Sequence, residues 1–268
     1  MGDHKTCEKI TAVMQKFLQD ITREAGDATL KIFGQAEVQY TKSSPTDFVT
    51  QADLQADKIL FDHIREMYPD HGIISEEREA FQKDAEYVWV YDPIDGTRNF
   101  ATHIPLYGTM VGLARNGVME LAAMYFPATK EFFFAELGDG ALLNGKSIHC
   151  SEQKEFHHSF GAFPVRHKAD RVPLFEKFLK KAREGNQFGV QNVSCIAVSA
   201  AYVASGRWAW LVFSGGGIWD HCAPALILQE AGCRVTNFRG EVWKFGDTEI
   251  VAANPILHPQ ILDVINGA

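Results

Sequence analysis

An apolar segment that ends in two aspartates constrains the fold more than any other feature of the chain. Residues 87–91 read Tyr-Val-Trp-Val-Tyr, the composition of a buried strand, and Asp92-Pro-Ile-Asp95 follows at once. Pro93 fixes one backbone angle and lacks an amide hydrogen, so the chain should leave the sheet there and bring Asp95 back toward Asp92. Two carboxylates at a buried strand end repel each other and lose their hydration. This is unfavourable unless a divalent cation binds both and compensates the cost.

The same residues also have a purely structural interpretation. Asp92 and Asp95 can each cap a turn, and Gly96 can supply a positive φ angle. For an isolated Asp-x-x-Asp-Gly pattern this interpretation is favoured. A functional interpretation gains weight only when further acids follow other apolar segments of the chain.

Such acids are present at two other places. Glu76 and Glu77 come directly after the short apolar segment at residues 73–74, and Asp220 stands at the start of a small-residue helix. Each alone is typical of a solvated surface or of an N-cap. Taken with the two aspartates above, Glu76 and Asp220 complete a set of oxygen ligands without patterned histidine or cysteine. That set favours Mg²⁺ or Mn²⁺ over zinc.

Gly96 and Thr97 follow the second aspartate and are suited to an anion. If a helix begins at this point, their backbone amides point at a bound phosphate. The hydroxyl of Thr97 could also orient a water molecule. The stretch therefore predicts a phosphate beside a metal.

Hydrophobic periodicity divides the chain into helices and strands. Apolar residues spaced by three and four predict a helix from about Ile10 to Gly34, and a second helix, capped by Thr50, that ends before Pro69. Apolar segments separated by turn signals predict an antiparallel meander over residues 106–144. In the second half the pattern predicts helices at residues 174–183, at 195–205, from 219 and from 258, and strands near residue 190, at 208–213 and near 235 and 250.

The length and the lack of a low-complexity linker predict two halves that share one compact body. The chain has 268 residues, of which 46% are hydrophobic, enough to bury a sizeable core. We expect an N-terminal α+β half over residues 1–150, with most of the acids described above. A C-terminal α/β half over residues 151–268 would contribute Asp220.

Charge and cysteine content limit the partners and the compartment. A net charge of −8 leaves no basic surplus, so a nucleic-acid backbone and an anionic membrane surface are both poor partners. The five cysteines show no Cys-x-x-Cys spacing, and the polar start lacks the apolar core of a signal peptide. We expect a reducing, cytoplasmic environment.

Four motifs occur together along the chain. They are Thr46-Asp47-Phe-Val-Thr50 with Asp53, Ser75-Glu76-Glu77, Asp92-Pro-Ile-Asp-Gly-Thr-Arg-Asn-Phe100, and Trp219-Asp-His-Cys-Ala-Pro-Ala225 followed by Glu230-Ala-Gly232. In order and spacing they resemble the inositol monophosphatase family, over nearly the whole chain. The resemblance implies an α+β fold, a layered αβαβα sandwich of the inositol monophosphatase and sugar phosphatase type. It also implies a Mg²⁺-dependent, Li⁺-sensitive phosphomonoesterase that is commonly a homodimer.

The resemblance also implies residue roles. Thr97 with Glu76 would position and deprotonate the attacking water, and Asp47 would support that pair or a further metal. Asp53 would be a supporting hydrogen-bond acceptor, and the amides of Gly96 and Thr97 would hold the phosphate. Two or three Mg²⁺ ions, or Mn²⁺ in their place, would activate water without a covalent intermediate. The implied metal ligands are Glu76, Asp92, the carbonyl of Ile94, Asp95 and Asp220.

Two departures from the family pattern concern the pocket for the substrate alcohol, which the C-terminal half would provide with Ser194, Phe213 and Asp220. Inositol-directed members place a glutamate on the strand ahead of the last metal-binding aspartate, and this chain has Phe213 there. The small-residue helix usually opens with glycine, and Ser194 stands in that place. Phosphate cleavage should survive both changes, whereas a preference for inositol comes into question.

We therefore expect hydrolysis of a small phosphorylated metabolite, with inositol monophosphate as the family default. The alternatives with the same chemistry are a histidinol-phosphatase, a fructose-1,6-bisphosphatase and a 3′(2′),5′-bisphosphate nucleotidase. An alternative of another class is a non-catalytic protein that uses this fold to bind a metal or a partner.

Overall fold

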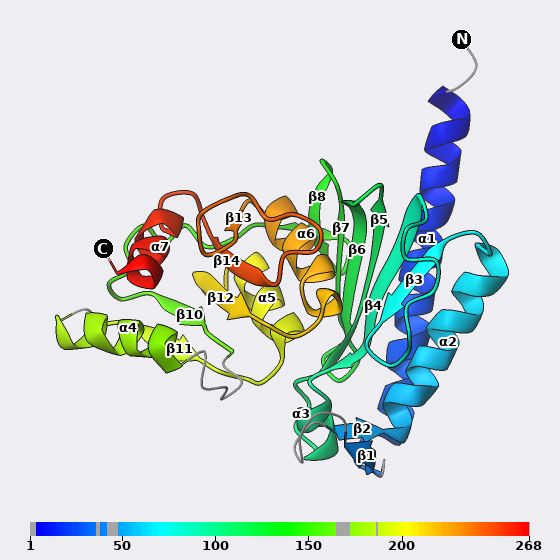
Figure 1. Cartoon of the computed structure of the whole chain (residues 1–268), viewed down its shortest axis with the longest axis horizontal. Coiled ribbons are helices and arrows are strands. Elements are labelled where there is room, and N and C mark those ends of the chain that lie inside the picture. Colours follow the sequence, from blue (N-terminus) through cyan, green and yellow to red (C-terminus); the bar gives the residue numbers. More distant parts are fainter. Residues whose placement is uncertain (1–3, 36–37, 42–47, 165–171, 186, 268) are drawn as a thin grey trace.

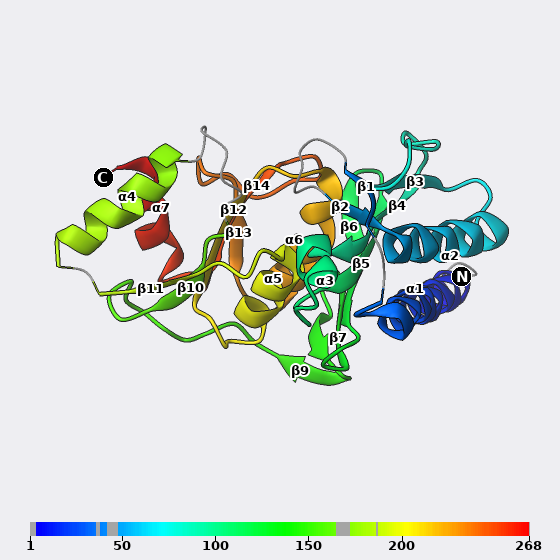
Figure 2. The ribbon, with the colours of Figure 1, turned by 90° about the horizontal axis from the view of Figure 1, so that it is seen from below.

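The protein is a stack of alternating helix and sheet layers, seen in a computed structural model that describes residues 4–35, 38–41, 48–164, 172–185 and 187–267. The layers are two long helices, a seven-stranded sheet, two short helices, a five-stranded sheet and two outer helices. Figure 1 shows how these layers follow one another. The same layers are seen from below in Figure 2. The predicted αβαβα arrangement is confirmed.

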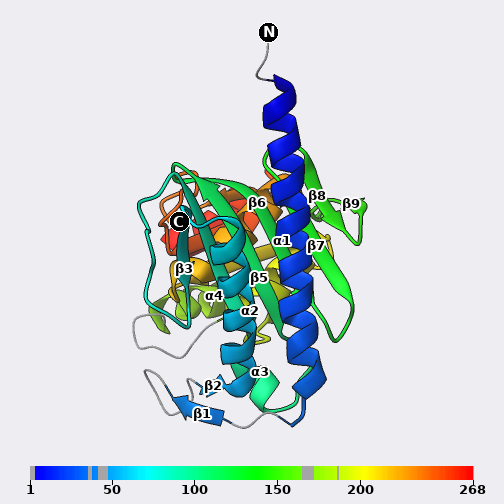
Figure 3. The same cartoon turned by 90° about the vertical axis from the view of Figure 1, so that its right-hand side faces the viewer.

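Helices α1 (His4–Ile32) and α2 (Gln51–Met67) form the first layer and lie across one face of the larger sheet (Figure 3). The start of α1 lies six residues before the apolar pattern predicted. The predicted cap of α2 is confirmed: Thr50 accepts a hydrogen bond from the amide of Ala52, and its own amide donates to Asp53. A small hairpin, β1 (Val38–Thr41) and β2 (Phe48–Thr50), precedes α2.

The seven-stranded sheet has its strands in chain order, and only its first pair is parallel. The remaining pairs are antiparallel, which confirms the meander predicted over residues 106–144. The strands are β3 (Gly72–Ser75), β4 (Tyr87–Asp95), β5 (Gly108–Arg115), β6 (Val118–Phe126), β7 (Glu131–Glu136), β8 (Gly140–Leu143) and β9 (Lys146–Ile148).

The five-stranded sheet has the order β11-β10-β12-β14-β13. Alternate residues of β12 enter different cores: Trp210 packs with the outer helices, whereas Phe213 packs with the helices between the sheets. The strands are β10 (Phe160–Ala162), β11 (Gly189–Gln191), β12 (Trp210–Ser214), β13 (Arg234–Thr236) and β14 (Glu249–Ala253), and the outer helices are α4 (Val172–Arg183) and α7 (His258–Asn266).

Helices α5 (Ile196–Ala204) and α6 (Cys222–Glu230) lie between the two sheets. Small side chains such as Ala197 and Ala200 let α5 approach α6, and one core cluster joins both helices to both sheets. A 3-10 turn, Ile218–Asp220, leads into α6, and the short helix α3 (Thr97–Ala101) follows β4. The division into halves at residues 1–150 and 151–268 stays a prediction.

Glu230 joins α6 to the larger sheet. Its two carboxylate oxygens accept hydrogen bonds from the amide of Gly138, in the turn after β7, at 2.9 Å, and from that of Gly140, the first residue of β8, at 2.8 Å. The acid of the Glu230-Ala-Gly232 motif thus has a structural task. Within the described ranges no helix is both long and apolar enough to cross a membrane.

We expect Glu230→Ala to lower the free energy of unfolding by about 1–2 kcal/mol, because two backbone donors lose a charged acceptor. Urea denaturation would measure the change. The control is Glu176→Ala, at an exposed site on α4, which should change stability by less than about 0.5 kcal/mol. Equal losses in the two variants would contradict this role of Glu230.

Candidate metal centre

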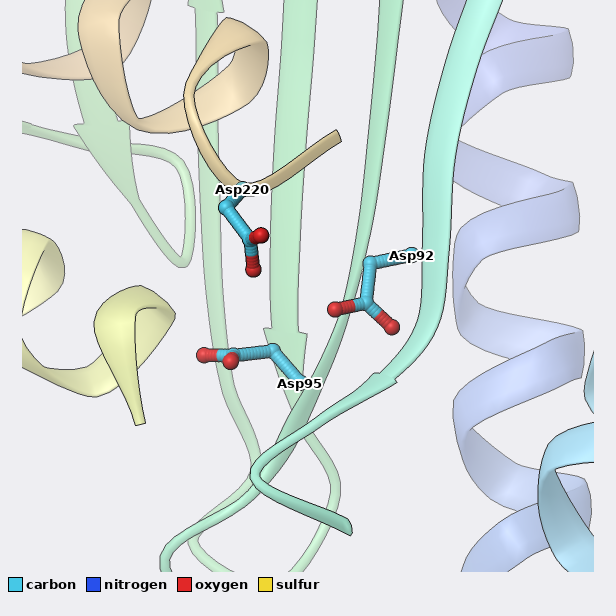
Figure 4. A group of neighbouring side chains, drawn as sticks. All are labelled: Asp92, Asp95 and Asp220. Carbon is cyan, nitrogen blue, oxygen red and sulfur yellow. The ribbon is translucent and has the colours of Figure 1, made fainter. Parts of the chain in front are cut away.

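Three buried carboxylates meet between the two sheets. Asp92 and Asp95 come from the end of β4, and Asp220 from the 3-10 turn ahead of α6. One carboxylate oxygen of each lies within 4.8 Å of those of the other two. Figure 4 shows how the three side chains lie beside one another. Their exposed fractions are 1%, 6% and 6%. We call these three residues the aspartate triad.

The end of β4 turns in the way that its proline predicts. The pairing of β4 with β5 shifts register between Asp92 and Asp95, and an oxygen of Asp92 accepts a hydrogen bond from the amide of Ile94 at 2.9 Å. The hydroxyl of Thr109 on β5 donates to the carbonyl of Pro93 at 2.8 Å. These contacts fix the irregular strand end, so that both carboxylates face the same space.

Asp220 is held by the glycine loop before it. Its Oδ2 accepts a hydrogen bond from the amide of Gly217 at 2.7 Å. A Cβ atom on Gly216 would lie only 2.0 Å from that same oxygen, and Gly216 has a φ of +77°. The position therefore requires glycine both for space and for backbone conformation. The predicted helix start at Asp220 is confirmed, with a 3-10 turn before α6.

Asp95 is oriented from the other side by the start of α5. Its Oδ2 accepts hydrogen bonds from the amide of Ala197 at 2.6 Å and from the thiol of Cys195 at 2.8 Å. Burial, with the charge of Asp95, raises the pKa of Cys195 well above its usual range, so the thiol keeps its proton and donates. Sequence reasoning did not find Cys195, whose only signal is its place at the N-cap of the small-residue helix.

Thr97 lies beside the triad at the start of α3. Its hydroxyl oxygen is 3.1 Å from Oδ1 of Asp53 and 2.9 Å from the carbonyl of Ile94. Asp53 thus makes the supporting contact that the sequence predicted. Gly96, the N-cap, has a φ of +88°, and a Cβ there would lie 2.9 Å from the carbonyl of Leu106. The structural interpretation of this glycine is therefore correct, and its contact with phosphate stays a prediction.

Like charges dominate the electrostatics of the site. Burial raises the pKa of Asp92 well above its usual range, and the charges of Glu76, Asp95 and Asp220 raise it further. A divalent cation would reverse this balance by supplying the missing positive charge. The donor set, three buried carboxylates, has the oxygen chemistry and the charge that suit Mg²⁺ or Mn²⁺. The aspartate triad could therefore hold a metal ion.

The other predicted site residues differ in how closely they approach the triad. Glu76 is half-buried at the end of β3, near enough to affect the pKa of Asp92 but outside the 4.8 Å group. Ser194 is exposed, ahead of α5, and Phe213 is 7% exposed with its ring 4.9 Å from that of His221. Asp47 lies outside the described residues.

Comparison with known proteins gives one consistent family. The sequence model of the inositol monophosphatase family matches residues 11–267. A fructose-1,6-bisphosphatase/inositol-1-monophosphatase of Thermotoga maritima is 29% identical over 246 residues, 92% of this chain and 93% of the relative. A putative Nus factor SuhB of Neisseria meningitidis serogroup B is 34% identical over 252 residues, covering 91% of this chain and 95% of the relative.

The fold has a correspondingly close match among solved structures. The extragenic suppressor protein suhB of Bartonella henselae superposes with a TM-score of 0.87 at 28% identity, over 95% of this chain and 98% of that one. The agreement covers all the layers that carry the aspartate triad.

Removal of one charge of the aspartate triad should raise stability relative to wild type in the absence of metal and lower it in the presence of Mg²⁺. In metal-free buffer we expect Asp92→Asn to melt at a higher temperature than wild type, because it relieves repulsion while the asparagine oxygen still accepts from Ile94. When the Mg²⁺ concentration is a hundred times the Kd of wild type, the free energy of unfolding of wild type should rise by about 2.7 kcal/mol. That of the variant should rise much less. Thermal melts with and without Mg²⁺ would measure this. A control at the exposed Asp62 of α2, Asp62→Asn, should show no reversal.

The buried carboxyl group of Asp53 should make the stability of the fold depend on pH. Burial raises the pKa of Asp53 from 3.8 to about 6, although Thr50 donates two hydrogen bonds that favour the charged form. Because the folded state holds this proton more tightly, its stabilising effect is complete below pH 4 and is lost as the pH rises through 6. In metal-free buffer, wild type should therefore lose on the order of 2–3 kcal/mol of stability relative to Asp53→Asn between pH 4 and 7. A difference that stays constant with pH would refute the shift.

Proposed function

Because the chain belongs to the inositol monophosphatase family, we propose that it is a Mg²⁺-dependent phosphatase of a small phosphomonoester. The observation that carries the proposal is the meeting of the aspartate triad beside Thr97 at the start of α3. A buried group of like charges is costly unless a cation binds it, and Mg²⁺ has the matching ligand preference. The family match supplies the reaction class.

We assign the residues as follows. Asp92, Asp95, Asp220, Glu76 and the carbonyl of Ile94 would bind the metal, with Asp47 supporting a further ion. Bound Mg²⁺ supplies a Lewis acid for the phosphate and lowers the pKa of a water molecule.

The remaining roles fall to the start of α3 and to Glu76. The amides of Gly96 and Thr97 would bind the phosphate. Glu76 would accept a proton from the attacking water, and the Thr97 hydroxyl would hold that water in place. Asp53 supports this arrangement, because its carboxylate lies within hydrogen-bond distance of the hydroxyl oxygen.

The identity of the alcohol is a separate part of the proposal. The Thermotoga relative carries the names of two substrates, a fructose bisphosphate and an inositol monophosphate. At the position where inositol-directed members have glutamate, this chain buries Phe213 against His221. A buried phenyl ring offers no acceptor to a hydroxyl group. We therefore place sugar phosphates and bisphosphates beside inositol monophosphate as candidate substrates, with histidinol phosphate and 3′(2′),5′-nucleotides as further alternatives.

A second candidate function is favoured by one observation, the name of the Neisseria relative, a putative Nus factor. In that case this chain would bind a macromolecular partner through its surface, and the triad would stabilise the fold by binding metal. Lithium sensitivity, a homodimer and a cytoplasmic location are further parts of the family proposal.

Phosphate release from a panel of substrates tests the proposal first. The panel is inositol 1-phosphate, fructose 1,6-bisphosphate, histidinol phosphate and adenosine 3′,5′-bisphosphate, each with and without Mg²⁺ and Li⁺. We expect Mg²⁺-dependent release that Li⁺ inhibits, and loss of that release in Asp220→Asn with its fold retained. No release from any compound, in folded protein shown to bind Mg²⁺, would refute the phosphatase and favour the partner-binding candidate.

The role of Thr97 has its own test. Thr97→Ala should lower kcat by about a hundredfold or more and change KM little, because positioning of the water matters in the transition state. Thr97→Ser, which keeps the hydroxyl, is the matched control and should retain most of the activity. A large rise in KM at nearly unchanged kcat would mean that Thr97 only binds the phosphate.

A further inference from the structure

Another buried carboxylate, that of Asp57 on α2, lies on the opposite face of the larger sheet from the aspartate triad. Its side chain is 6% exposed. Oδ1 accepts hydrogen bonds at 3.0 Å from the hydroxyls of Ser75 and Tyr91 and from Nε of Arg78. Oδ2 accepts a further bond from Nη2 of Arg78. One carboxylate thus joins a helix, the end of β3, the middle of β4 and the loop after β3.

The strand register shows why this junction matters for the metal site. Ser75 and Tyr91 are direct partners in the parallel pair of β3 and β4. The next residue on each strand is a proposed metal ligand, Glu76 or Asp92. Tyr91 packs in the core formed with α1 and α2. Because side chains alternate along a strand, Asp92 faces away from these helices, and Figure 4 shows its carboxylate on that side. Asp57 therefore binds β3 and β4 through the residues immediately before the two proposed ligands.

Arg78 completes the junction from the far side of Glu76. Its guanidinium carbon lies 3.7 Å from the centre of the Phe61 ring, also on α2, while two of its N–H groups bind Asp57. The segment from Ser75 to Arg78 is therefore fixed to the same carboxylate at both ends, with Glu76 between. Inside the segment, the hydroxyl oxygen of Ser75 also accepts a hydrogen bond from the backbone amide of Glu77 at 3.2 Å.

The charge balance makes Arg78 the essential partner. Asp57 is a buried anion, and Arg78, whose side chain is 27% exposed, is its ion-pair partner. Two parallel N–H bonds from a guanidinium fix direction as well as distance, which an ammonium group does not. Loss of Arg78 would leave the carboxylate buried without a cation, and the segment that holds Glu76 would be free to move away from β4.

From this geometry we propose that Asp57 and Arg78 are positioning residues of the metal centre: they hold Glu76 at the distance from Asp92 at which both bind the same ion. The inference rests on the proposed function, which makes Glu76 and Asp92 ligands. Neither Asp57 nor Arg78 touches the substrate. Their effect passes through the backbone of β3 and β4 at Ser75 and Tyr91.

The test measures Mg²⁺ binding directly, by calorimetry on the full chain. We expect Arg78→Met to raise the Kd for Mg²⁺ about tenfold or more, the usual effect of losing a residue that orients a metal ligand. Arg78→Lys should restore part of the affinity. The matched control is Arg115→Met: Arg115 also pairs with a carboxylate, Glu86, and lies over an aromatic ring, Tyr87, but at the opposite end of β4. The Kd of Arg115→Met for Mg²⁺ should equal that of wild type.

A double-mutant cycle separates positioning from a general loss of stability. If Arg78 acts through Glu76, then Arg78→Met should add no further rise in Kd to Glu76→Gln. Independent, additive effects would overturn the proposal, as would an unchanged Kd in Arg78→Met. Should Arg78→Met fail to fold, Tyr91→Phe removes one bond to Asp57 and keeps the ring, and we expect a rise in Kd of a few fold. An unchanged Kd there would then overturn the proposal.

Failure of the inference is distinguishable from failure of the proposed function. Wild type that binds Mg²⁺ and releases phosphate, beside an Arg78→Met variant with the same Kd, would overturn only the positioning role. Wild type that binds no Mg²⁺ would overturn the proposed function, and the positioning role with it.

Discussion

Repulsion within the aspartate triad is the constraint on which the site depends. Each carboxylate is anchored by one backbone amide, and these amides, from Ile94, Ala197 and Gly217, belong to β4, to α5 and to the loop before α6. The three charges therefore meet only after both sheets have packed on the helices between them. Hydrophobic packing supplies the free energy that holds like charges together, and a cation then gains from their proximity.

The fold was predictable wherever local chemistry and tertiary packing agree. The cap at Thr50, the meander between residues 106 and 144 and the strand predicted at residues 208–213 all follow from patterns that the structure confirms. The early start of α1 at His4 was not predictable, because apolar periodicity begins later than the helix. Strand β10, Phe160-Gly161-Ala162, was missed because it contains no β-branched residue, unlike the equally short β11 and β13 with Val190 and Val235.

The site was predictable to the extent that its acids directly follow apolar segments. The triad could be proposed for that reason, since strand ends and helix starts at one sheet edge meet in space. Cys195 and Asp57 could not be proposed, because their importance arises from hydrogen bonds to partners far away in sequence, Asp95 for the first and Arg78 for the second. Such contacts come from the docking of elements, which no local pattern encodes.

The two departures from the family pattern, at Ser194 and Phe213, leave the aspartate triad in place. Ser194, where the family pattern has glycine, has a φ of +53°, so the glycine preference there reflects a left-handed backbone at the entry to α5. A serine that keeps this conformation costs about 1–2 kcal/mol of strain but leaves the path of α5, and hence the anchor of Asp95, unchanged. Phe213 is buried in the core between the two sheets, where its ring lies 4.9 Å from that of His221, and it offers no charged group to the triad. Both departures therefore leave the backbone anchors and the charges of the three aspartates as the fold sets them.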